Sequence, residues 1–333
     1  MCIVAKIASI LEDVMEIKRD LYLDKLIARK HNGLIKVVTG IRRCGKSYLL
    51  NTLFYNHLKA YGVSDDHIVK FAFDSADDLL MIGENLIKLE KSKKRVDPEK
   101  FMAYIRSKVV DNQMYYLLLD EVQLLDCFEA VLNGYLRKEN MDVYVTGSNA
   151  KFLSKDIITE FAGRGDEIRM YPLSFAEFMT AYSGDKYTGL SEYMLYGGIP
   201  LVVLRNGANE KSAALQSLFD EIYIRDIEKR NKIRNIGELE DLLNILSSSI
   251  GSLTNPEKLS NTFKTVKKSK ITATTIRKYL GYLEDSFLIE STQRYDIKGR
   301  NYIETPRKYY FSDLGLRNAR INFRQFEQTH SME

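Results

Sequence analysis

The sequence predicts an α/β fold in which a parallel sheet carries helices on both faces and is followed by a helical region. Apolar, β-rich segments alternate with helical patterns, which is typical of parallel strands joined by helices. After residue 173 the β-rich pattern stops and helical periodicity takes over. Five strands are expected, at residues 34–39, 68–73, 115–120, 142–146 and 167–171.

The composition is that of a soluble globular protein. Charged residues make up 28% of the chain, hydrophobic residues make up 45%, and only five residues are proline, which excludes extensive disorder. The three cysteines, Cys2, Cys44 and Cys127, are widely spaced, as expected in a reducing compartment. No uncharged run approaches the roughly 18 residues that a membrane-spanning helix needs. We therefore expect a cytoplasmic protein without a membrane partner.

The segment from Gly40 to Ser47 reads GIRRCGKS and matches the pattern G-x-x-x-x-G-K-[ST] directly after the first expected strand. Glycines allow backbone N–H groups to turn towards phosphate oxygens, the lysine offsets phosphate charge, and the serine hydroxyl can bind Mg²⁺. A chance glycine-rich turn is the alternative, but the strand, the loop and a helix starting at about Ser47 favour phosphate binding. The residues expected to contact the nucleotide are Gly40, Ile41, Arg42, Arg43, Cys44, Gly45, Lys46, Ser47 and Tyr48.

Two consecutive acids follow the third expected strand, in the sequence YYLLLDEVQ. Ligands of parallel sheets bind at the carboxyl ends of the strands, so this position is typical of a Walker B element. We expect Asp120 and Ser47 to hold Mg²⁺, and Glu121 to polarise the water that attacks the γ-phosphate. Lys46 would also act on the transferred phosphate. The alternative is a helix N-terminus that merely carries acids.

The next expected strand ends in the sequence VTGSNA, which brings polar side chains to the same edge of the sheet. If the strand order resembles that of other ATPases, this strand lies between the phosphate-loop strand and the Walker B strand. Asn149 is then a candidate catalytic residue that orients the attacking water, with Ser148 as the alternative. A simple turn or helix cap would use the same residue types.

Arginines at three positions are candidates for contact with the γ-phosphate. Arg164 lies in a Gly-Arg-Gly corner before the fifth expected strand, and it could act within its own chain or from a neighbouring subunit. An ordinary salt bridge or an exposed corner is the alternative for Arg164. Arg225 and Arg230 lie on an expected helix of the second half, where one of them could sense nucleotide. Ion pairing on the helix surface is the favoured interpretation for both.

The C-terminal third changes character again, with a helix, a turn, a second helix and a β-hairpin that together suggest a winged helix. Its second helix, at residues 272–285, would turn four apolar side chains towards a core: Ile276, Tyr279, Leu280 and Leu283. Residues 258–308 are strongly basic, and Thr274, Thr275, Arg277 and Lys278 would be exposed to a DNA major groove. Contact with a protein is an equal alternative.

Together, the segments GIRRCGKS, LLLDEVQ, VYVTGSNA, FAGRGDEIRMYPLSFAEF, YGGIPLVV, YIRDIEKR and KYLGYLEDSFLIE resemble a widespread bacterial and archaeal family of AAA+-type ATPases over residues 20–320. The resemblance implies phosphate-loop roles for Gly40, Gly45, Lys46 and Ser47, Walker B roles for Asp120 and Glu121, and a finger role for Arg164. Family members have an ATPase core, a helical lid and a winged-helix domain, and usually continue into a nuclease-like fold. This chain ends at Glu333, so we expect a truncated or naturally short member.

On this pattern, 333 residues divide into an N-terminal helix (1–20), a P-loop ATPase core (21–172), a helical lid (173–250), a winged-helix-like domain (251–322) and the start of a truncated C-terminal region (323–333). The expected function is binding and hydrolysis of ATP with Mg²⁺, which drives a conformational switch, with coupling to DNA left open. The alternative is a DNA- or protein-binding regulator that holds nucleotide with negligible turnover. Assembly with further copies of the chain or with a protein partner also stays open.

Overall fold

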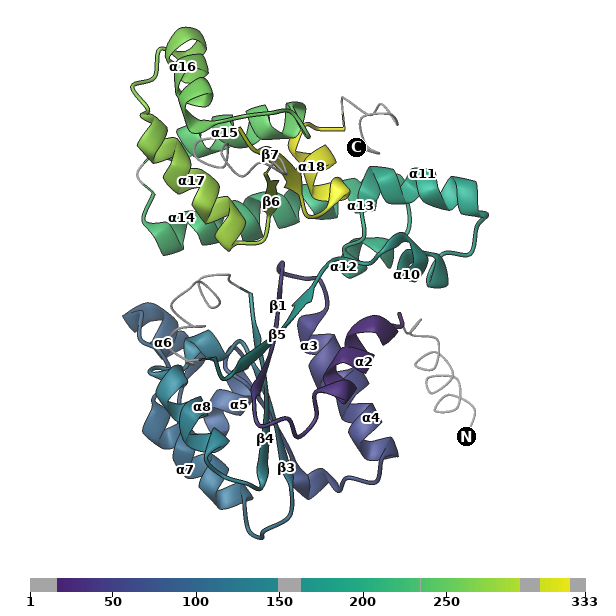
Figure 1. Cartoon of the computed structure of the whole chain (residues 1–333), viewed down its shortest axis with the longest axis vertical. Helices are drawn as coiled ribbons and strands as arrows, with labels where there is room; N and C mark the ends of the chain where they lie inside the picture. The colour runs from purple at the N-terminus through teal and green to yellow at the C-terminus, as the bar shows by residue number, and fades with distance from the viewer. Residues whose placement is uncertain (1–16, 149–162, 234, 294–305, 324–333) are drawn as a thin grey trace, which may run out of the picture.

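A computed structural model describes residues 17–148, 163–233, 235–293 and 306–323 (Figure 1). Three of the expectations therefore lie wholly or mostly outside the described residues. They are the N-terminal helix at 1–20, of which only the last residues are described, the candidate Asn149, and the C-terminal region at 323–333.

The core of the molecule is a parallel sheet of five strands in the order β2-β3-β4-β1-β5. All five predicted strands are confirmed, with ends shifted by at most two residues, and β4 lies between β1 and β3 as expected. Every residue of β1, β3 and β4 is buried because helices cover both faces of the sheet. The strands are β1 (Ile35–Gly40), β2 (Ile68–Ala72), β3 (Tyr115–Asp120), β4 (Met141–Gly147) and β5 (Gly165–Met170).

Two helical layers cover the sheet, and each buries alternate strand residues. Val38 and Tyr144 belong to the apolar cluster on one face, and their neighbours Val37 and Val143 belong to the cluster on the other. The first layer consists of α2 (Asp20–Ala28) and of α3 (Lys46–Tyr48), which continues through the π-helical η1 (Leu49–Phe54) into α4 (Tyr55–Ala60) (Figure 1). The second consists of α5 (Ala76–Met81), α6 (Leu86–Ser92), α7 (Pro98–Lys108) and α8 (Phe128–Leu136), with the short turns η2 (Asp65–His67) and η3 (Val122–Leu124) at the strand ends.

The second half of the chain is mainly helical, as predicted. Figure 1 shows that it lies beyond the end of the sheet at which β5 ends. Its first helices are α10 (Phe175–Thr180), α11 (Lys186–Tyr196), α12 (Pro200–Val203), α13 (Ala208–Ser217), the π-helical η5 (Leu218–Ile224) and α14 (Arg225–Asn231). In the ranges that the structure describes, no helix is both long and apolar enough to cross a membrane.

The C-terminal module has the predicted order of helices followed by an antiparallel strand pair. It consists of α15 (Ile236–Ser248), α16 (Pro256–Lys267), α17 (Ala273–Asp285), β6 (Ile289–Thr292), β7 (Lys308–Phe311) and α18 (Leu314–Arg320). The four predicted core positions of α17 are all buried. Thr275 is half-buried beside the helix cap, where its N–H donates to the Thr272 hydroxyl, so the expectation that it is exposed was wrong. The name winged helix stays a prediction.

Helix α18 returns to pack against α11, and buried polar contacts fix this junction. Asp313, which caps α18, accepts hydrogen bonds from the N–H groups of Gly198 at 2.7 Å and Leu316 at 3.0 Å. A Cβ atom at Gly197 would lie 2.2 Å from the Asp313 carboxylate, so only glycine fits there. Burial raises the pKa of Asp313 to about 6, although these N–H groups oppose the shift. The C-terminal module is therefore attached directly to the helical region.

Candidate active site

The loop after β1 has the backbone conformation that its glycines predict. Gly40 has a φ of 140°, and a Cβ atom there would lie 2.0 Å from the carbonyl oxygen of Met170, so the close approach of β5 requires glycine. Arg43 and Gly45 also have positive φ values, of 64° and 101°. Turns of this kind form backbone concavities that bind anions. The helix that follows begins at Lys46, one residue before the predicted start, and its N-terminus faces the loop.

Lys46 is nearly buried at the centre of this loop, with 5% of its surface exposed. Its Nζ donates hydrogen bonds to the carbonyl oxygens of Gly40 at 3.0 Å and Ile41 at 3.1 Å. Both described hydrogen-bond acceptors of this buried ammonium group are neutral. Phosphate oxygens would therefore be favoured partners for it.

The other predicted nucleotide contacts divide into buried and exposed side chains. Ile41 and Cys44 are buried, so in this loop they can meet a ligand only through their backbone. The Cys44 Sγ lies 3.7 Å from the Met170 carbonyl oxygen, and burial raises the pKa of the thiol. Arg43 and Tyr48 are exposed.

Asp120 ends β3 and reaches the start of the helix after the loop. Its carboxylate accepts a hydrogen bond from the hydroxyl group of Thr146. Burial raises the pKa of Asp120, while the nearby hydroxyl groups of Ser47 and Thr146 and the charge of Lys46 oppose the shift. Mg²⁺ prefers oxygen ligands and usually keeps several waters. The pair formed by Ser47 and Asp120 fits that preference.

Glu121 directly follows Asp120 and is held in an unusual backbone conformation. Its φ of 52° lies in the left-handed region, which non-glycine residues adopt mainly where the surrounding structure imposes it. The Glu121 N–H donates to Thr146 Oγ1 at 3.0 Å. Its carboxylate accepts hydrogen bonds from the hydroxyl of Ser148, at 3.0 Å, and from the amide of Gln123. Ser148 thus lies beside the candidate base, whereas Asn149 lies outside the described residues.

Sequence reasoning assigned no role to Asp74 or Gln123. Asp74 follows β2, and partial desolvation together with the charges of Asp120 and Glu121 raises its pKa. Because β2 is the neighbour of β3 in the sheet, their carboxyl ends lie at one edge. The acid at the end of β2 was visible in the sequence, but its closeness to the other two followed only from the strand order.

Helix α14 and the segment before it contact the phosphate loop at Arg42. Asp226 Oδ1 lies 3.6 Å from Arg42 Nη1, and the Tyr223 hydroxyl donates to the Arg42 carbonyl oxygen at 2.8 Å. Asp226 Oδ2 also pairs with Arg230 Nη2 at 2.8 Å. The expected ion pairing of Arg230 is confirmed. Burial lowers the pKa of Arg230, and the charges of Asp226 and Glu121 oppose the shift, so Arg230 lies within electrostatic reach of Glu121.

Arg164 lies at the other end of the sheet from the phosphate loop. It directly precedes β5, is exposed, and its carbonyl oxygen accepts a hydrogen bond of 2.9 Å from the N–H of Ile35 at the start of β1. The loop follows the end of β1, where Gly40 pairs with Met170. At about 3.3 Å per residue, the length of β1 places roughly 17 Å between Arg164 and the loop. Arg164 therefore lies too far from its own phosphate loop to contact it in this structure, and a contact with a neighbouring subunit stays a prediction.

Comparisons with known proteins identify relatives of both halves of the chain. Residues 32–179 match the AAA domain family, and residues 187–327 match a domain of unknown function, DUF8612. An uncharacterised Haemophilus influenzae protein is 36% identical over 313 residues, which is 92% of this chain and 74% of that protein. An uncharacterised Methanocaldococcus jannaschii protein is 28% identical over 323 residues, which is 92% of this chain but only 65% of that protein. The solved structure of a Walker-type ATPase from Pyrococcus abyssi aligns with a TM-score of 0.63 at 16% identity, over 92% of this chain and 96% of the other.

The AAA match contains the phosphate loop, Asp120, Glu121 and all five strands of the sheet. The structural alignment supports the fold, and the predicted parallel α/β arrangement of P-loop proteins is confirmed. The resemblance noted from the sequence motifs is confirmed by the same matches and by the Haemophilus relative. The chain belongs to the AAA-type P-loop ATPase family, and its AAA domain is followed by a DUF8612 domain.

Proposed function

We propose that this chain hydrolyses ATP with Mg²⁺ and that the bound nucleotide changes the position of the helical region. The observation that carries the proposal is the carboxylate of Glu121, which lies beside the Asp120 and Ser47 pair and is oriented by Ser148 and Gln123. A site that only bound nucleotide would not need an oriented second carboxylate. Glu121 therefore favours hydrolysis over binding alone.

In this mechanism the loop and Lys46 bind the phosphates, and the N-terminal end of the following helix adds favourable charge. Ser47 and Asp120 would hold Mg²⁺, which when bound offsets negative charge on the phosphate groups. Glu121 accepts a hydrogen bond from the attacking water and draws its proton. Thr146 holds the two acids in different positions, because its hydroxyl donates to the carboxylate of Asp120 and accepts from the backbone N–H of Glu121. Asp120 can then bind the metal ion while Glu121 acts on the water.

The switch rests on Asp226, which shares its two oxygens between Arg42 of the loop and Arg230 of α14. The phosphates of ATP carry more negative charge than one carboxylate, so they compete with Asp226 for both arginines. Exchange of these partners would loosen α14 from the loop. The C-terminal module would follow, because its helix α17 packs against α14. The ion pair of 2.7 Å between Arg169 of β5 and Glu290 of β6 would then be strained or broken.

Replacing Asp226 by asparagine should tighten ATP binding by about two- to fivefold, because a partly exposed ion pair contributes up to about 1 kcal/mol and no longer competes. Titration with a fluorescent ATP analogue measures the change. Glu228→Gln, on the same helix, is the matched control and should leave affinity unchanged. Unchanged or weaker binding by the Asp226 variant would show that this carboxylate supports the loop rather than competing with the phosphate.

Replacing Arg164 by alanine should reduce turnover on the order of 10³-fold and preserve ATP affinity, if this arginine acts on the nucleotide of a neighbouring subunit. Phosphate release by mixed variants tests the direction of action. Arg164→Ala subunits keep a complete phosphate loop, and Lys46→Ala subunits keep the arginine, so mixing the two should restore activity. Normal turnover by Arg164→Ala alone would reject the finger role.

The test of the proposed function is phosphate release from ATP by the purified chain, with and without Mg²⁺ and with and without duplex DNA. DNA is included because Arg277 and Lys278 are exposed on α17 and the surrounding segment is basic. Mg²⁺-dependent release supports hydrolysis, and stimulation by DNA would extend it to a coupled ATPase. ATP binding without release would favour the alternative, a regulator that holds nucleotide.

A further inference from the structure

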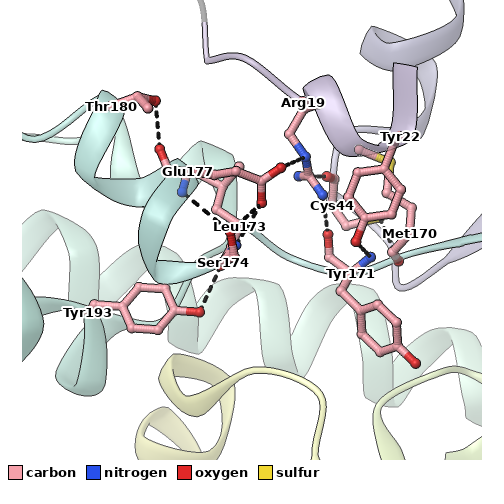
Figure 2. A network of polar contacts seen from close by, with 10 residues as sticks. All are labelled: Arg19, Tyr22, Cys44, Met170, Tyr171, Leu173, Ser174, Glu177, Thr180 and Tyr193. Atoms are coloured by element: carbon pink, nitrogen blue, oxygen red, sulfur yellow. Dashed lines mark hydrogen bonds and ion pairs between the residues drawn. The ribbon is translucent and has the colours of Figure 1, made fainter. Parts of the chain in front are cut away.

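Arg19 is a buried arginine outside the matched AAA domain, yet it joins three separate parts of the site. It lies directly before α2, and 2% of its surface is exposed. Figure 2 shows its guanidinium between the phosphate loop, the end of the sheet and the first helix of the helical region. Nη1 donates to the Cys44 carbonyl oxygen at 3.1 Å, and Nη2 donates to the Tyr171 carbonyl oxygen at 2.6 Å. Nε lies 2.9 Å from Glu177 Oε1.

The contact with Cys44 bears on how the loop presents its backbone. In a trans peptide the C=O of one residue and the N–H of the next point in opposite directions, and no described peptide bond is cis. Arg19 holds the Cys44 carbonyl on the side of α2 and β5. The N–H of Gly45 must then point away from Arg19. The hydrogen bond therefore fixes the orientation of a donor within the phosphate loop.

The contact with Glu177 links the same guanidinium to α10. Glu177 belongs to a capping box, in which its Oε2 accepts from the Ser174 N–H at 2.8 Å and its own N–H donates to the Ser174 hydroxyl at 3.3 Å. One carboxylate oxygen thus serves the helix cap, and the other faces Arg19 (Figure 2). Displacement of α10 would therefore move a charged partner of Arg19.

The linker between β5 and α10 is held on both sides of this contact. The Tyr171 N–H donates to the Tyr22 hydroxyl of α2 at 3.2 Å, and the Tyr193 hydroxyl of α11 donates to the Leu173 carbonyl oxygen at 2.8 Å (Figure 2). Because hydrogen bonds hold this linker at both Tyr171 and Leu173, a shift of α10 would also move the residues that contact Arg19. A buried ion pair whose partner moves away becomes unfavourable, so Arg19 responds to the position of α10.

We propose that Arg19 is a positioning residue that orients the Cys44–Gly45 peptide for phosphate binding and makes that orientation depend on α10. The inference rests on the proposed binding of ATP at this loop. The planar fork of arginine reaches three partners at once, which the single ammonium group of lysine cannot do. Nucleotide affinity should therefore depend on the guanidinium shape and not on positive charge alone.

The experiment measures the Kd for ATP and the turnover at saturating ATP for Arg19→Lys, with Arg29→Lys as the matched control. Arg29 lies just after the same helix and pairs with Asp166 at 2.8 Å, but it has no described contact with the loop. Arg19→Lys should raise the Kd for ATP about tenfold or more, because a hydrogen bond from a charged group contributes a free energy of that size. Turnover at saturating ATP should stay within about twofold of the wild-type value. Arg29→Lys should change neither value.

Two further variants separate positioning from a general loss of structure. Arg19→Ala should regain part of its affinity when guanidinium is added at low millimolar concentration, a rescue that damaged packing would not give. Glu177→Gln should raise Kd in the same direction, and the double variant Arg19→Lys with Glu177→Gln should be less than additive. Wild-type affinity in Arg19→Lys, or additive effects in the double variant, would overturn the inference. Failure of the wild-type chain to bind ATP would instead refute the proposed function.

Discussion

Replacing Glu121 by glutamine should leave ATP binding intact and reduce turnover by about 10²- to 10⁴-fold, which is the usual contribution of a general base. Glutamine has nearly the shape of glutamate, and its oxygen can still accept hydrogen bonds from Ser148 and Gln123. The loop and Lys46, which bind the phosphates, are untouched by the change. Phosphate release at saturating ATP and titration with a fluorescent nucleotide measure the two effects separately.

Glu139→Gln is a suitable control for this prediction, because Glu139 is exposed and lies at the opposite end of β4 from the site. An equal loss of binding and turnover in the Glu121 variant would contradict the division of roles between Asp120 and Glu121. Undiminished turnover would assign the base to another residue. Asp74 is then the next residue to replace, because burial and the charges of Asp120 and Glu121 raise its pKa at the same edge of the sheet.

Replacing Lys46 by alanine should weaken ATP binding by about 10²-fold or more, since a hydrogen bond between charged groups contributes on the order of 1.5–3 kcal/mol and long-range attraction adds to it. The ammonium group is nearly buried, and its two described partners, the carbonyl oxygens of Gly40 and Ile41, are neutral. Its main charge partner would be the phosphate. Nucleotide titration with and without Mg²⁺ measures the loss.

Removing Lys46 also takes a hydrogen-bond donor from the carbonyl groups of Gly40 and Ile41, although the Ile41 oxygen still accepts from the Cys44 N–H at 3.3 Å. Thermal unfolding should therefore be recorded beside the titration. If the alanine variant is unstable, Lys46→Met keeps the apolar stem and removes only the charge. Lys59→Ala is the control, because Lys59 lies on the same continuous helix and pairs with Asp65 at 2.9 Å, away from the loop. Wild-type affinity in a folded Lys46 variant would place the nucleotide elsewhere.

Much of the fold and part of the site could be predicted because the relevant residues are close together in the sequence. The strand from Tyr115 opens with five consecutive aromatic or aliphatic residues, and the strand from Ile35 is apolar apart from Lys36 and Thr39, as a sheet covered on both faces favours. The apolar spacing of α17 likewise identified its buried face before any packing was known. The phosphate loop and the Asp120 and Glu121 pair are consecutive residues whose chemistry follows from order and spacing.

The remaining functional contacts depend on residues that are far apart in the chain. Arg19 lies 25 residues before Cys44 and 152 residues before Tyr171, and Tyr223 lies 181 residues after Arg42. Likewise, the register of β5 against β1 decided that Arg164 lies away from its own loop.

Backbone preferences and apolar periodicity act over a few residues, so the sequence alone was enough to identify the strands, the loop and the acid pair. Strand order and helix packing bring distant side chains together, and neither can be read from local spacing. The coupling of the loop to Arg19, Asp226 and Tyr223 was therefore decided only by the tertiary structure.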